Sequence, residues 1–183
     1  MTRKICIVLI ALLLLTGTAF AATLNIPDIL TLEYPDNWDN YGADDEDDVE
    51  GEYYNLGFVC GVGARDLNVG IDLYYYPEYA DLRLFELEEA DVKDFAGRLM
   101  EDYTDPRFME IRWVGAHRIP FVIMEATDSY GPYYIAETLT NGWDLCITGY
   151  AFSDSNYDTA RELTDDDLET FLAIVDSIVP IVN

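Results

Sequence analysis

The chain is poor in the side chains that most metal sites and nucleophilic catalysts use. It contains one histidine, His117, which excludes a histidine-rich metal site or a pair of catalytic histidines. His117 stands beside Arg118 in an expected turn, without a nucleophile and an orienting partner. The serines occupy turn or helix contexts that lack a nucleophile elbow. We therefore interpret His117 as a surface residue and expect no enzymatic activity.

Basic residues are also scarce. Lys and Arg number 10 against 36 Asp and Glu, giving a formal net charge of −26. Such a surface repels phosphate backbones and anionic lipid headgroups, which argues against nucleic acid and anionic membranes as partners. Cations and basic proteins remain compatible with this charge. The simplest interpretation is solubility outside the cell.

The apolar run near the start of the chain is short. It covers 11 residues from Ile5 to Leu15, against the roughly 20 that span a bilayer. Arg3 and Lys4 precede it, and small residues follow up to Ala21. This pattern predicts a signal peptide over residues 1–21, cleaved after Ala21, and a secreted or periplasmic protein.

Cysteine is limited to three residues, and Cys6 lies inside the predicted signal peptide. Export permits a disulfide between Cys60 and Cys146. Strand alternation, however, places Cys60 on an apolar face and Cys146 on a polar one, which bonding geometry would forbid. We expect two buried free thiols, and no lipid anchor.

Three consecutive strands dominate the second half of the chain. Ile119–Thr127, Tyr133–Leu139 and Trp143–Phe152 are rich in β-branched and aromatic residues and are separated by turn signals. A three-residue loop, 140–142, would pair Leu139 with Trp143, Glu137 with Leu145 and Ile135 with Ile147. We prefer it because a two-residue loop would mix polar and apolar side chains on one face.

The remaining periodic segments complete the expected fold. Further strands are predicted at Ile29–Tyr34, Tyr53–Val62, Leu67–Tyr76 and Phe108–Val114, and a four-residue hairpin loop would pair Phe58 with Ile71. Helical periodicity covers Glu88–Tyr103 and Asp165–Val179, the second with Thr164 and Asp167 as a capping box. These elements predict one α+β domain over residues 22–183. Its mainly antiparallel sheet of about six to seven strands is flanked by two amphipathic helices.

An acidic stretch, residues 36–52, is predicted to be an exposed loop. A calcium loop would need oxygen ligands at alternating positions around a Gly turn, and Tyr41 breaks that pattern. A weak calcium site is the alternative to a solvated charge run, with candidate ligands Asp44, Asp45, Asp47 and Asp48. No other cofactor is expected. The three aspartates at 165–167 lie in the first turn of an expected helix, where negative charge is stabilised by the helix dipole, so we do not interpret them as a metal site.

Tyrosines form the candidate binding surface. Tyrosine rings beside carboxylates can bind sugars or peptides. The alternative is that tyrosine simply suits half-buried strands. The candidate surface residues are Tyr74, Tyr76, Tyr79 and Tyr134.

The order of elements resembles the PsbP-like superfamily, which includes photosystem extrinsic proteins and many small exported bacterial proteins. The resemblance covers nearly all of residues 22–183 and rests on short words such as Glu33-Tyr34-Pro35-Asp36-Asn37-Trp38, Val114 to Phe121, Tyr133-Tyr134, Asn141-Gly142 and Asp176-Ser177-Ile178. It implies an α/β/α sandwich with a binding or assembly role without catalysis. The acidic stretch departs from the family pattern, and no functional residues are carried over.

The sequence therefore predicts an exported, monomeric, non-catalytic binding or assembly module for an unidentified protein or carbohydrate. One alternative is a calcium-responsive surface or adhesion component that acts through the acidic loop. The other is a carboxylate-based hydrolase, which two acidic side chains converging in a deep apolar cleft would support.

Overall fold

The computed structural model describes residues 20–26, 30–35, 38–43, 53–59, 66–152 and 159–180. Residues 1–19 of the predicted signal peptide lie outside the described residues. So do Cys60 and the four aspartates proposed as calcium ligands, Asp44, Asp45, Asp47 and Asp48.

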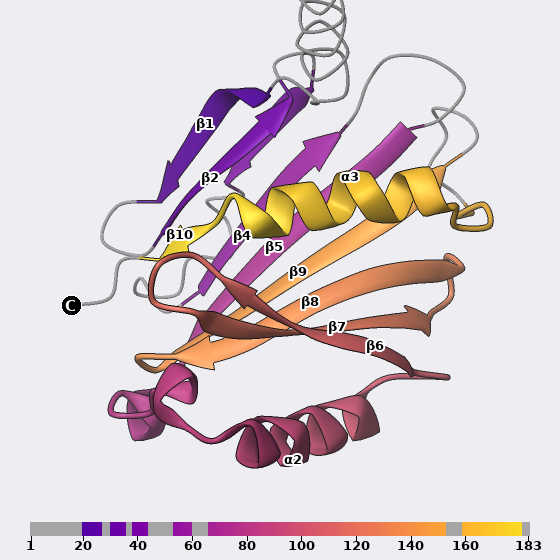
Figure 1. Cartoon of the computed structure of the whole chain (residues 1–183). Helices are drawn as coiled ribbons and strands as arrows, with labels where there is room; N and C mark the ends of the chain where they lie inside the picture. Colours follow the sequence, from indigo (N-terminus) through magenta and orange to yellow (C-terminus); the bar gives the residue numbers. More distant parts are fainter. Residues whose placement is uncertain are drawn as a thin grey trace, which may run out of the picture.

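The main sheet is antiparallel throughout, with strand order β3-β4-β5-β9-β8-β7-β6 (Figure 1). A smaller antiparallel sheet has the order β1-β2-β10. The strands are β1 (Phe20–Ile26), β2 (Leu30–Pro35), β3 (Asp39–Ala43), β4 (Tyr53–Val59), β5 (Asp66–Tyr75), β6 (Arg107–Val114), β7 (Ile119–Thr127), β8 (Pro132–Thr140), β9 (Trp143–Phe152) and β10 (Val179–Pro180). The expected α+β class with an antiparallel sheet and two helices is confirmed. Strand β3 corrects the prediction of a continuous loop over residues 36–52, because it pairs with β4.

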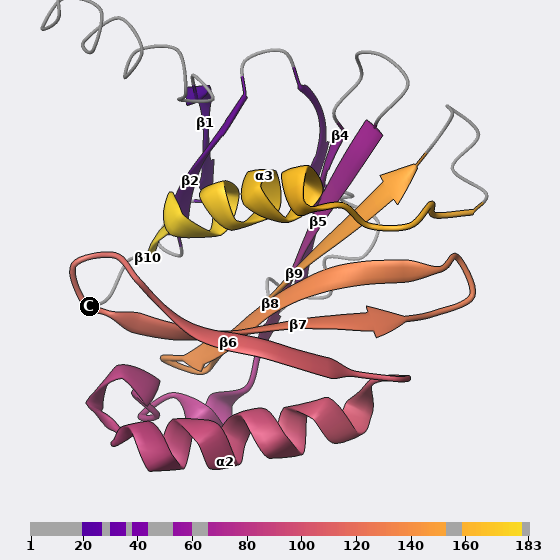
Figure 2. The same cartoon turned by 45° about the vertical axis from the view of Figure 1, so that its right-hand side comes forward.

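The two helices lie on opposite faces of the main sheet (Figure 2). They are α2 (Glu89–Leu99) and α3 (Asp165–Asp176). Three short 3-10 helices accompany α2: η2 (Pro77–Tyr79), η3 (Leu84–Glu86) and η4 (Met100–Asp102). Strand β7 shows why both faces need a cover, since Phe121 and Ile123 pack on the α3 side while Val122 and Met124 pack on the α2 side. A sheet covered twice calls for apolar residues at successive positions.

The start of α3 follows the predicted capping box. The backbone N–H of Asp167 donates to Thr164 Oγ1 over 3.3 Å, and the backbone N–H of Thr164 donates to Asp167 Oδ2 over 3.0 Å. Arg161 adds a salt bridge of 2.7 Å to Asp167. The helix ends at Asp176, earlier than predicted, because Val179 and Pro180 pair with β2.

The predicted register of the β8–β9 hairpin is wrong. Its loop has two residues, Asn141 (φ 53°) and Gly142 (φ 82°), and the pairs include Leu139 with Asp144 and Glu137 with Cys146. Leu139 and Trp143 consequently lie on opposite faces of the sheet. The prediction required the polar groups to share one face, but the sheet is covered on both faces, and a two-residue turn with two positive φ values matches the strand twist.

The β4–β5 register differs from the prediction by two residues. Phe58 pairs with Val69 and Leu56 with Ile71, where the sequence predicted Phe58 opposite Ile71. A shift of two residues keeps every side chain on its own face, so the hydrophobic pattern cannot distinguish the two registers.

Candidate ligand-binding cleft

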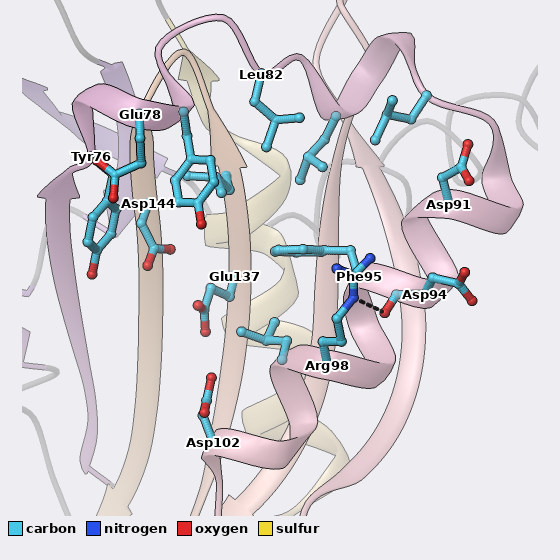
Figure 3. A pocket seen from close by; sticks show the side chains of 15 residues that line it. Tyr76, Glu78, Leu82, Asp91, Asp94, Phe95, Arg98, Asp102, Glu137 and Asp144 are labelled. Atoms are coloured by element: carbon cyan, nitrogen blue, oxygen red, sulfur yellow. Dashed lines mark hydrogen bonds between the residues drawn. The ribbon is translucent and has the colours of Figure 1, made fainter.

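A cleft of about 590 Å³ opens between α2, the segment that precedes it and the sheet (Figure 3). This volume lies within the range typical of small-molecule sites, roughly 300 to 1,000 Å³. We call it the α2 cleft. Its lining residues are Tyr76, Glu78, Tyr79, Leu82, Leu84, Leu87, Asp91, Asp94, Phe95, Arg98, Leu99, Asp102, Glu137, Leu139 and Asp144.

The wall formed by residues 76–83 is attached to the turn of the β8–β9 hairpin. The backbone N–H of Tyr76 donates to the carbonyl oxygen of Gly142 over 2.7 Å, and that of Asn141 donates to the carbonyl oxygen of Leu82 over 3.0 Å. Pro77 suits the first position of η2 because its ring fixes φ and the missing N–H is not needed there. The hairpin turn thus positions both this wall and the acidic floor below it.

Two carboxyl groups, those of Glu137 and Asp144, lie on the floor of the cleft. Glu137 pairs with Cys146, and Asp144 pairs with Leu139, so the two acids are diagonal neighbours on adjacent strands. Glu137 is 5% exposed. Figure 3 shows both side chains pointing into the cleft. The two-residue turn creates this pair, because the predicted register would have placed Glu137 opposite Leu145.

Glu137 has a hydrogen-bond partner from the helix layer. The hydroxyl group of Tyr103, one residue beyond η4, donates to Glu137 Oε2. The same hydroxyl lies 3.7 Å from the sulfur of Cys146, which is a free thiol. In the described part of the chain, Asp144 Oδ1 is buried and has no hydrogen-bond partner. The acid pair therefore contains a buried acceptor without a donor among the described residues.

Burial raises the pKa of each of the four side chains at the floor of the cleft. Burial and, next, the charge of Asp144 raise the pKa of Glu137. Burial also raises the pKa of Asp144, against the effect of its interaction with Glu137. The pKa of Tyr103 and that of Cys146 are raised as well, chiefly by burial. The pair therefore holds a proton to a higher pH than two exposed carboxyl groups would.

The rim of the cleft adds further negative charge. Its acidic side chains are Glu78, Asp91, Asp94 and Asp102. Among the lining residues that the structure describes, Arg98 is the one basic side chain, and its Nε atom donates to the backbone carbonyl oxygen of Asp94 over 3.4 Å (Figure 3). Six carboxyl groups thus surround a cleft with one guanidinium group.

Of the four tyrosines proposed as a binding surface, Tyr76 and Tyr79 line the cleft and Tyr74 lies beside Tyr76. Tyr74, Tyr76 and Tyr79 are 42%, 38% and 45% exposed. The ring centroids of Tyr74 and Tyr76 are 6.5 Å apart, and those of Tyr76 and Tyr79 are 6.1 Å apart. Tyr134 does not belong to this surface: it is buried on the opposite face of the sheet, where its ring packs on Phe171, because neighbouring strand residues alternate between faces.

The other residues considered from the sequence lie elsewhere. His117 is exposed in the turn between β6 and β7, with its ring 6.5 Å from that of Phe85. Asp167 serves the cap of α3. Sequence reasoning did not single out Glu137, Asp144 or Tyr103. The available signal was Glu137, an acidic residue in a mostly apolar strand. It points to a functional site only when both faces of that strand are known to be covered.

The described residues contain no group of three or more His, Cys, Asp or Glu side chains placed to hold a metal ion. Neither α2 nor α3 has the length and apolar character needed to cross a membrane, and no other helix of the described part does. In comparisons with known proteins, no family model matches the chain and no curated protein matches it.

Proposed function

We propose that the protein is an exported, non-catalytic binding module that holds a small ligand in the α2 cleft. The observation that carries this proposal is a cleft of about 590 Å³ that combines apolar and aromatic side chains with the buried Glu137 and the half-buried Asp144 on its floor. Small-molecule sites combine mostly apolar walls with a few converging polar groups in this way. The unpartnered Oδ1 atom of Asp144 supports the same assignment, because a buried acceptor without a partner is costly.

The proposal includes a PsbP-like α/β/α sandwich with a sheet of about six to seven strands. The arrangement that supports it is an antiparallel sheet with α2 on one face and α3 on the other. The family resemblance implies binding or assembly roles, which agrees with a cleft of small-molecule size. The signal-peptide pattern at residues 1–21 supports export.

A fragment screen by amide NMR tests the binding function. We expect ligands to shift the resonances of α2 and of residues 137–144, while those of α3 stay unchanged. Leu87 lines the cleft and is 37% exposed, so Leu87→Trp places an indole where the ligand would sit and should abolish the shifts. Shifts confined to other surfaces, or shifts unaffected by Leu87→Trp, would contradict the proposal.

A carboxylate-based hydrolase is the second candidate, and the pairing of Glu137 with Asp144 favours it. Two nearby acids with raised pKa values resemble an acid and base pair. However, glycoside hydrolysis requires carboxyl groups on either side of the scissile bond, whereas these two lie side by side on one floor. Turnover of chromogenic aryl glycosides that Glu137→Gln and Asp144→Asn both abolish would favour the hydrolase over the binding module.

A further inference from the structure

The charges of the α2 cleft are strongly unbalanced. Its described lining has two acids on the floor, Glu137 and Asp144, four more acids at the rim, and one basic residue, Arg98. Arg98 is exposed, and its Nε atom donates to a backbone carbonyl of its own helix rather than to Glu137 or Asp144. An anionic ligand would meet repulsion from every side of this cleft, whereas a cation would be attracted.

The floor also contains an acceptor that needs a donor. Asp144 Oδ1 is buried without a partner in the described part of the chain. Glu137 accepts from Tyr103, which fixes one of its oxygen atoms in place. An ammonium or guanidinium group presents several N–H donors at once and brings the opposite charge. Such a group could donate to Asp144 Oδ1 and balance the negative charge that the pair retains beside its shared proton.

The walls suit the body of an organic molecule better than a hydrated metal ion. No group of three or more potential metal ligands occurs among the described residues. Tyr76 and Tyr79 meet edge to face at the mouth, with an interplanar angle of 69°. Aromatic faces attract cations, and Phe95 and Leu99 add apolar surface to the lining of the cleft. A positively charged head on an aliphatic or aromatic body therefore matches the acids of the floor, the aromatic rings and the apolar surface of the cleft.

We propose that the α2 cleft binds a small organic cation, an ammonium or guanidinium group carried on an aliphatic or aromatic body. The charged head contacts Glu137 and Asp144, and the body lies against Phe95 and Leu99. This inference rests on the proposed function, namely that the cleft holds a ligand, and adds the chemical class of that ligand.

Three probes of similar size test the class. Phenethylamine and 2-phenylethanol share a phenethyl body and differ in the charge of the head, and phenylacetate carries an anionic head on a benzyl body. Calorimetric titration at neutral pH should show the amine binding about tenfold or more tightly than the alcohol, with phenylacetate weakest, because hydrogen bonds to charged groups are the stronger ones. Asp144→Asn should bring the amine and the alcohol within about twofold of each other, since the charged acceptor is lost. Glu169→Gln, at an exposed position of α3, should leave the preference unchanged.

A second variant keeps the test informative if Asp144→Asn fails to fold. Tyr79→Leu removes an exposed aromatic face and should weaken the amine by about two- to fivefold, with little effect on the alcohol. Equal binding of amine and alcohol to the wild type would overturn the cation assignment, yet would leave the proposed binding function standing. Preference for an added methyl glucoside over the amine would also overturn it. Absence of any binding, including in the fragment screen, would overturn both.

Discussion

The hydroxyl group of Tyr103 donates a hydrogen bond to Glu137, which joins the end of the α2 segment to the middle of β8. The contact crosses the boundary between the helix layer and the sheet, beside the thiol of Cys146. The contact therefore fixes the position of Glu137, on the floor of the α2 cleft, relative to the helical segment that forms one wall.

Tyr103→Phe should destabilise the fold by about 1 to 3 kcal/mol, because it leaves a buried oxygen of Glu137 without its donor. Urea denaturation measures the change. The matched control is Tyr79→Phe, at an exposed ring of the same cleft, for which we expect a change within about 0.5 kcal/mol. Equal effects of the two substitutions would contradict a structural role for the Tyr103 hydroxyl.

Glu137→Gln should flatten the dependence of stability on pH. Burial and Asp144 raise the pKa of Glu137 above the ordinary value of about 4.3, so the native state binds this proton more tightly than the unfolded state. The stabilisation is complete below the unfolded-state pKa and is lost as the pH rises through the folded-state pKa. The free energy of unfolding of the wild type should therefore fall between about pH 5 and pH 8, relative to that of Glu137→Gln.

Urea denaturation at a series of pH values measures this difference. Glu169→Gln is the control, since it removes an acid from the exposed surface of α3 and should follow the wild type. A wild type that gained stability relative to Glu137→Gln over the same range would show that the carboxyl group is ionised at no cost in the native state.

Thr164→Ala should cost about 0.5 to 2 kcal/mol of stability, because Thr164 accepts from the first turn of α3 and completes the capping box with Asp167. Thr170→Ala is the control. The hydroxyl of Thr170 donates to a carbonyl of its own helix, and alanine has the higher helix propensity, so its effect should be close to zero. Thermal unfolding followed by circular dichroism compares them, and a larger loss for Thr170→Ala would refute the cap.

Gly142→Ala should destabilise the protein by more than about 1 kcal/mol and weaken the wall of the α2 cleft. Gly142 has φ +82°, and a Cβ atom would lie 2.7 Å from the ring of Tyr75 and 3.0 Å from the carbonyl oxygen of Tyr76. Gly97→Ala in α2 is the opposite case, since nothing lies within 4 Å of its Cβ position, and it should stabilise by about 0.5 to 1 kcal/mol. If Gly142→Ala proved as harmless as Gly97→Ala, the two-residue turn would be wrong.

Cys146 should react slowly with iodoacetamide in the native protein and rapidly in urea. Burial raises the pKa of its thiol, and the thiolate is the reactive form. Peptide mapping after timed alkylation separates Cys146 from Cys60, and unreduced, denatured protein should carry the label at Cys146 because its thiol is free. Cys146 is half-buried, where the sequence predicted a buried thiol, and labelling of the native protein as fast as in urea would contradict the raised pKa of this thiol.

Local patterns were sufficient for most of the secondary structure. β7 and β9 have the bounds that their β-branched and aromatic residues predicted. The predicted apolar stripe of α2 includes Val92, Ala96 and Leu99, which are all buried. The cap of α3 was predicted from Thr164 and Asp167 alone. These features depend on interactions within a few residues, which the order of the chain contains directly.

The candidate site depended on more distant relationships. The predicted three-residue loop placed the polar and apolar side chains on different faces, which assumes that one face of the sheet is exposed to solvent. Covering by α2 and α3 removes that assumption, and the two-residue turn then brings Glu137 and Asp144 together. The same covering explains why Tyr134 is buried while Tyr76 and Tyr79 surround the cleft.

The sequence by itself determined the elements, the α+β class and the acidic character of the protein, because periodicity, capping and net charge are properties of local order and composition. Only the tertiary structure decided which acids share a cleft and that Asp144 Oδ1 is buried there without a donor among the described residues. Strand register and the packing of helices on both faces set those relations, and many registers satisfy the same hydrophobic pattern.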